Sequence, residues 1–199
     1  MNRPTTALLF ASLLALSACD ETDAVAVRIR LRDDLSGTVR TSALVLPAAE
    51  GTVQSETQGV TWSNRVDVAC ATGTFASFGD LHVSDLRFEA GGGEAAIGFA
   101  RITIPRGETA RWPKAFVPLS APERKDAAAA LDPSGKSQDV GATIKIEIEL
   151  PAVVIGNGVT GKTRGTKVEN EGTVATLVVP IDSVAAETDP IVWHLTWQK

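Results

Sequence analysis

Three arginines stand at every second position near the start of the chain, at Arg28, Arg30 and Arg32. Apolar residues alternate with them, so the three guanidinium groups are expected on one face of a β-strand. Guanidinium groups bind carboxylates and phosphates through paired hydrogen bonds, and Arg40 is expected opposite across a hairpin. The row therefore predicts either a contact for an anionic ligand or head group, or the solvated face of an edge strand that its charge protects from further pairing. The pattern favours the second.

The residues that most often bind metals or act as nucleophiles are few. The chain has two histidines, His82 and His194, and two cysteines, of which Cys70 lies outside the N-terminal segment. This supply is too small for an ordinary zinc site. Cys70 has the strand parity of neighbouring valines and is expected as a buried, inert thiol, because a reactive one would need a cation beside it. No metal, cofactor or catalytic residue is predicted.

Two acidic clusters offer oxygen ligands. Asp33 and Asp34 precede a glycine, and Glu169 and Glu171 flank an asparagine. Neither cluster has the run of oxygen ligands of a calcium-binding loop, so solvated turn carboxylates are expected. Paired carboxylates could also hydrolyse glycosides, although no spacing in the sequence favours this.

The chain has four tryptophans and no tyrosine. Trp193 and Trp197 share one parity of the last predicted strand and are expected in the core, which leaves His194 facing solvent or a neighbouring strand. Trp112 lies in a proline-punctuated stretch after Arg111. We predict Trp112 as a surface contact for a ligand or a partner.

Alternation of apolar and polar residues governs most of the remaining chain. The predicted strands are 24–32, 38–46, 62–70, 81–90, 95–105, 142–150, 173–180 and 191–197. A shift of parity after Val83 predicts a bulge or bend near Ser84-Asp85 in the fourth of these. One helix is predicted over 122–131, with Ser120 or Ala121 at its cap. The sequence therefore predicts an all-β fold, mainly an antiparallel sandwich or a partly open barrel, with one short helix in a long loop near 120–132.

The first residues form a separate segment. Arg3 precedes the apolar run Thr5–Leu16, which as a helix would span about 18 Å, too short for a hydrocarbon core of about 30 Å. This is typical of a secretory signal. The following Leu16-Ser17-Ala18-Cys19 resembles the lipobox of bacterial lipoproteins. The resemblance implies cleavage between Ala18 and Cys19, and attachment of a diacylglyceryl group and often a further acyl chain (such as palmitate) to Cys19.

The domain boundaries follow from this segment. We expect a signal peptide at 1–18, a lipid anchor and short tether at 19–23, and a single β-rich domain at 24–199. Asp20 resembles the residue that keeps enterobacterial lipoproteins in the inner membrane, so the periplasmic face of that membrane is favoured over the outer membrane. The net charge of −5 without a basic cluster argues against nucleic-acid binding and against adhesion to anionic lipid through surface charge.

Three stretches together resemble the LppM-type domain of bacterial envelope proteins. They are Val27–Gly37, Leu150–Gly158 and Val192–Trp197, which carry a strand into an Asp/Gly-rich turn, a late Pro-x-Val stretch running to Asn-Gly, and a Trp-bearing last strand. The resemblance implies a β-rich extracytoplasmic domain that handles amphiphilic ligands, and it transfers no catalytic residue.

These observations predict a non-enzymatic, membrane-anchored lipoprotein that binds an amphiphile or an envelope protein. Two alternatives stay open. One is a secreted hydrolase of envelope polymers that uses paired carboxylates, and the other is a structural spacer without a ligand.

Overall fold

The structure is a computed structural model that describes residues 24–45, 58–63, 66–92, 96–131, 141–161 and 164–199. The predicted signal peptide, the cleavage site and the lipidated Cys19 lie outside the described residues, as do the ends of several predicted elements. Among the described residues, no helix combines the length and the apolar character needed to cross a bilayer.

Strands dominate the described chain, and four short helical segments join them. In chain order the elements are β1 (Ala24–Leu31), β2 (Gly37–Val45), β3 (Gln58–Ser63), β4 (Val66–Phe75), η1 (Phe78–Asp80), β5 (Arg87–Gly91), β6 (Ile97–Ile104), α1 (Trp112–Phe116), α2 (Ala121–Leu131), β7 (Thr143–Glu149), β8 (Val154–Thr160), β9 (Lys167–Glu171), β10 (Val174–Pro180), α3 (Ile181–Ala186) and β11 (Ile191–Gln198).

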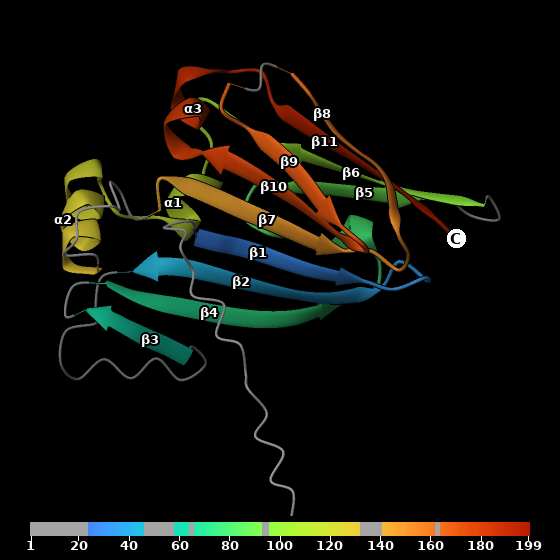
Figure 1. The fold of residues 1–199 in the computed structure, drawn as a ribbon, viewed down its shortest axis with the longest axis horizontal. Coiled ribbons are helices and arrows are strands. Elements are labelled where there is room, and N and C mark those ends of the chain that lie inside the picture. The colour runs from blue at the N-terminus through green and yellow to red at the C-terminus, as the bar shows by residue number, and fades with distance from the viewer. Residues whose placement is uncertain (1–23, 46–57, 64–65, 93–95, 132–140, 162–163) are drawn as a thin grey trace, which may run out of the picture.

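These strands form two sheets (Figure 1). The larger has seven strands in the order β3-β4-β2-β1-β7-β10-β9, and the smaller has four in the order β5-β6-β11-β8. Every pairing between strands is antiparallel except that of β1 with β7, which is parallel. The predicted all-β, mainly antiparallel sandwich with a helix near 120–132 is confirmed.

The core lies between the two sheets. In β7 buried isoleucines alternate with partly exposed polar and charged residues, and in β6 and β11 buried positions also alternate with more exposed ones. Trp193 and Trp197 are buried, as the parity of the last strand predicted. Each such large apolar side chain stabilises the fold by about 1.5–3 kcal/mol when fully buried. Charged side chains consequently remain on the two outer faces.

The predicted opening hairpin is present, with β1 and β2 joined through Asp33–Ser36. The Asp34 carboxylate accepts hydrogen bonds from the Ser36 backbone N–H at 3.0 Å and from its hydroxyl at 2.6 Å. These bonds lower the pKa of Asp34. Leu35 takes a positive φ of 65°, which closes the turn.

The predicted helix at 122–131 is confirmed as α2, which starts one residue earlier. The Glu123 carboxylate accepts hydrogen bonds from the Ser120 hydroxyl at 2.6 Å and its backbone N–H at 2.7 Å, as at a capped helix start. Two short helices, α1 and α3, were not predicted. The bend predicted near Ser84-Asp85 is confirmed by a turn at Ser84, which has a φ of 51°. The strand expected over 81–90 is shorter than predicted, because it begins only after this turn, at Arg87.

Candidate functional site

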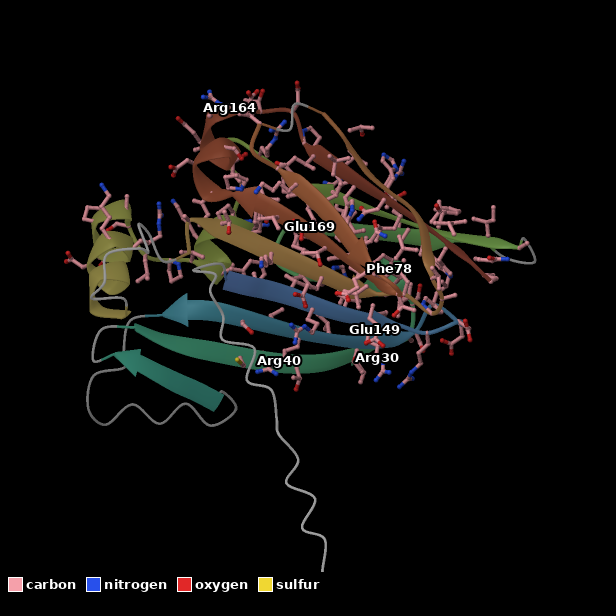
Figure 2. All side chains as sticks on the ribbon, viewed as in Figure 1. Arg30, Arg40, Phe78, Glu149, Arg164 and Glu169 are labelled. Atoms are coloured by element: carbon pink, nitrogen blue, oxygen red, sulfur yellow. The ribbon has the colours of Figure 1, made fainter. Side chains whose placement is uncertain are left out.

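The outer face of the seven-stranded sheet carries an open hollow of about 610 Å³. Strands β1, β2, β4 and β7 contribute its lining, which faces the viewer in Figure 2. We call this feature the arginine hollow. The residues that line it are Arg28, Arg30, Thr38, Val39, Arg40, Thr72, Gly73, Thr74 and Glu149.

Strand register places these side chains together. Arg28 pairs directly with Arg40 across β1 and β2, as the hairpin predicted, and Arg40 pairs with Thr72 on β4. One rung further along the same face, Arg30 pairs with Thr38. Paired residues on neighbouring strands project from the same face about 5 Å apart. The hollow therefore presents arginines on two strands beside a column of threonine hydroxyls.

Two of the three arginines are balanced by carboxylates from β7. Arg28 Nε lies 2.6 Å from Glu147 Oε2, and Arg30 Nε lies 3.2 Å from a Glu149 oxygen. The second contact is the more open one, with the Arg30 side chain 70% exposed and that of Glu149 41% exposed (Figure 2). Exposed pairs of this kind contribute about 0–1 kcal/mol each. Their main effect is to hold the guanidinium groups in place.

Arg40 is placed differently. It makes no ion pair with any described carboxylate, and its guanidinium lies 3.5 Å from the Cys70 sulfur. Arg28 and Arg40 are direct cross-strand neighbours, an arrangement that destabilises a sheet when both carry the same charge. Glu147 balances only one of them. The hollow therefore holds an excess of positive charge that an incoming anion would balance.

The prediction of a buried, inert Cys70 is wrong. Cys70 is only partly buried, on the same face as Arg40, with the Ser42 hydroxyl 3.6 Å from its sulfur. Burial raises the pKa of Cys70, but the hydrogen bonds from Arg40 and Ser42 outweigh it and leave the pKa below the usual value of a thiol. Parity with nearby valines did not reveal this environment, because the cation comes from another strand.

The edge-strand interpretation of the arginine row is also wrong. Strand β1 lies inside the sheet, between β2 and β7. Its parallel partner β7 follows more than a hundred residues later, so the local pattern could not reveal it. Arg32 does not join the hollow. It lies beyond the end of β1, beside Asp33, Asp34 and Pro151.

Trp112 is not a surface contact, and this prediction is corrected too. Its side chain is 0% exposed and belongs to the core. Its indole N–H donates to the Pro105 carbonyl at 2.8 Å, which satisfies the one polar group of the ring. The Asp85 carboxylate accepts the backbone N–H groups of Arg111 and Trp112 at 2.8 Å and so caps α1. The prolines around Trp112 suggested a surface loop. The hydrogen bonds from the backbone of Arg111 and Trp112 to Asp85, which is distant in sequence, instead hold this segment against the core.

The remaining candidates lie away from the hollow or outside its lining. His194 is exposed, and its Nε2 lies 3.4 Å from the Thr160 hydroxyl, on the outer face of the smaller sheet. Glu169 and Glu171 are exposed, as expected, but they lie on strand β9 and not in a turn, so that part of the prediction is wrong. Within the part of the chain that the structure describes, no three His, Cys, Asp or Glu side chains gather closely enough to hold a metal ion.

Sequence reasoning missed the carboxylates and hydroxyls of the hollow. On β7, Glu147 and Glu149 alternate with isoleucines, and on β1 the arginines alternate with apolar residues at the same period of two. Two strands with complementary charge at the same period are a signal for pairing, so Glu147 and Glu149 were detectable. The threonines give no comparable signal.

The fold and the hollow define a β-sandwich with a cationic, hydroxyl-rich face on its larger sheet. No family of known proteins, no characterised protein and no solved structure matches the chain.

Proposed function

We propose that this chain is a lipid-anchored extracytoplasmic binding protein, without catalytic activity, whose arginine hollow binds the anionic head group of an amphiphile. The anchor rests on the lipobox resemblance at Leu16–Cys19 and on the short apolar run before it. The binding role rests on the hollow. The observation that carries it is the direct pairing of Arg28 with Arg40, of which, among the described side chains, only Arg28 has a carboxylate partner.

The lining suits a phosphate or carboxylate that also bears hydroxyl groups. A guanidinium offers several N–H donors in a fixed plane, and phosphate or carboxylate oxygens accept them in pairs. Thr38, Thr72 and Thr74 supply hydroxyls that both donate and accept. A phosphodiester head group with a glycerol moiety would use both kinds of partner.

A binding role fits the carboxylates of the hollow better than the hydrolytic alternative does. Glu147 and Glu149 each contact an arginine, so both already serve to balance charge. We therefore assign them the role of positioning Arg28 and Arg30. The LppM-type resemblance, which implies amphiphilic ligands, agrees with this proposal and stays a prediction.

Isothermal titration with a short-chain phosphatidylglycerol, kept below its critical micelle concentration, tests the hollow. We expect saturable binding that weakens with salt, and much weaker binding of the matching phosphatidylcholine. Arg40→Gln should weaken binding about 5- to 30-fold, from the loss of about 1–2 kcal/mol in a charge-assisted contact. Arg32→Gln is the matched control, since it removes the same charge outside the hollow.

Two results would overturn the assignment. One is equal binding by Arg40→Gln and the unchanged protein. The other is that Arg40→Gln and Arg32→Gln each bind phosphatidylglycerol and phosphatidylcholine with equal affinity. Capture of an envelope protein through the same arginines, with no response to either lipid, would replace the amphiphile by a protein partner.

A further inference from the structure

The largest exposed apolar side chains gather at one end of the smaller sheet. Ile97, Phe99, Val153 and Ile155 are each between 49% and 57% exposed, and no other large hydrophobic side chain among the described residues is as open. We call these four residues the apolar end patch.

Strand pairing brings the four together on one face. Phe99 pairs with Thr196 on β11, and Thr196 pairs in turn with Gly156 on β8, next to Ile155. Ile97 and Phe99 flank the buried Gly98, and Val153 and Ile155 flank the buried Val154. Ile97 and Phe99 point away from the core by the alternation of β6. On β8 the register shifts, because Thr196 pairs with Gly156 and Trp197 with Val154, which leaves Ile155 as the extra residue of a β-bulge. Val153 and Ile155 are more than half exposed, whereas Val154 between them is buried.

Cations accompany this patch. On the same outer face, β5 and β6 present Arg87, Glu89 and Arg101, and Lys199 follows β11 with its backbone N–H bonded to the Ala96 carbonyl. Arg101 and Glu89 form an ion pair. These described side chains carry a formal charge of +2, whereas the whole chain carries −5.

We infer that the apolar end patch and its neighbouring cations form a second, protein-based contact with the surface of a bilayer that contains anionic lipid. Half-exposed apolar side chains beside Lys and Arg are the combination that favours the interface between head groups and acyl chains. This local face differs in sign from the net charge of the chain, from which no such adhesion was expected.

The size of the patch favours a bilayer over a second copy of the chain. Half of four large side chains amounts to roughly 400 Å², against about 800 Å² on each partner of a stable complex. A bilayer needs no minimum area of this kind, because weak interfacial contacts are reinforced by the anchor that the proposed function places at Cys19.

The proposed anchor can reach the same bilayer. Cys19 precedes Ala24, where β1 begins, by five residues, which span at most about 18 Å. If the smaller sheet lies against the bilayer, β1 stands about 15 Å above it, from a sheet separation of about 10 Å and one layer of side chains. The arginine hollow, on the other sheet, then opens toward the aqueous compartment.

Vesicle flotation of the mature chain carrying Cys19→Ser tests the patch without fatty chains. We expect flotation with vesicles of phosphatidylcholine and phosphatidylglycerol, little with phosphatidylcholine alone, and a decrease with salt. Phe99→Ser with Ile155→Ser should lower partitioning at least tenfold. Arg101→Gln should lower it two- to fivefold, whereas Lys167→Gln, which removes the same charge from β9 of the larger sheet and outside the hollow, should leave it unchanged.

A label gives a second measurement that does not depend on removing apolar residues. In a Cys70→Ser background, an environment-sensitive fluorophore at Ile155→Cys should shift to the blue on adding anionic vesicles, and one at Lys167→Cys, on β9 of the larger sheet and outside the hollow, should not. Equal shifts at both positions, or flotation unaffected by Phe99→Ser with Ile155→Ser, would overturn the inference. The inference would also be overturned if the chain did not float with vesicles and instead formed a concentration-dependent dimer that Phe99→Ser with Ile155→Ser abolishes.

Because these assays use a chain without acyl groups and leave the hollow intact, they separate failure of the patch from failure of the anchor or of the hollow.

Discussion

Removing one carboxylate from the arginine hollow should strengthen anion binding. Glu149 lies on its lining, with one oxygen 3.2 Å from Arg30 Nε. An anion bound among the arginines would stand about 6 Å from this carboxylate, and at effective dielectric constants of about 40–80 their repulsion is about 0.7–1.4 kcal/mol. The side-chain carbonyl introduced by Glu149→Gln can still accept a hydrogen bond from Arg30 Nε and keep that side chain in position. Glu149→Gln should therefore lower the dissociation constant for a phosphodiester head group about 3- to 10-fold.

The substitution should leave the fold intact, because a pair this exposed contributes about 0–1 kcal/mol to stability. Isothermal titration with short-chain phosphatidylglycerol measures the effect at about 0.1 M salt, where the Debye length is about 10 Å. Glu171→Gln is the matched control. It changes the net charge equally but lies two strands away from Glu149, beyond Val174, where screening removes most of the interaction. Unchanged or weaker binding by Glu149→Gln, in a variant with unchanged thermal stability, would refute the electrostatic reasoning.

Three further predictions concern stability and the thiol. Asn157→Ala should lower the free energy of unfolding by about 1–3 kcal/mol in urea titrations, because Asn157 Oδ1 accepts the indole N–H of the buried Trp193 at 2.7 Å; exposed Asn170→Ala is the control. Trp112→Ala should cost about 3–5 kcal/mol by the same measurement, since the side chain is buried in the core. Arg40→Gln should move the pH midpoint of Cys70 alkylation by iodoacetamide upward, because the hydrogen bond from Arg40 lowers the pKa of that thiol.

Each of these has a contradicting outcome. An Asn157→Ala midpoint no lower than that of Asn170→Ala would show that the Trp193 contact contributes nothing. A stable Trp112→Ala variant with impaired ligand binding would restore the surface role first predicted for Trp112. An unchanged alkylation profile in Arg40→Gln would remove Arg40 as the cause of the lowered pKa of Cys70.

Local periodicity carried the prediction of fold class. Alternation in β1, β7 and β11 identified the buried faces, and turn residues such as Asp34 marked the opening hairpin. Such signals work because a strand with one buried face must repeat every two residues. They also placed Arg40 across the hairpin from the arginine row, since the two strands of a hairpin are close in sequence, and the register of the structure then pairs Arg40 with Arg28.

Long-range pairing explains what the sequence did not reveal. Whether β1 lies at an edge depends on β7, more than a hundred residues later. The burial of Trp112 depends on Asp85, and the state of Cys70 depends on Arg40. Each error came from judging a residue by its chain neighbours when its decisive partner lies on another element.

The chemical state of Cys19 is the most direct test of the central claim. Intact mass spectrometry of the protein extracted with detergent from its own cell envelope should show a chain that begins at Cys19 and carries the mass of a diacylglyceryl group, with or without an amide-linked acyl chain. A Cys19→Ser variant should lose this mass and be released from the membrane fraction. A soluble chain that still begins at Met1, with the Cys19 sulfur unmodified, would contradict the account.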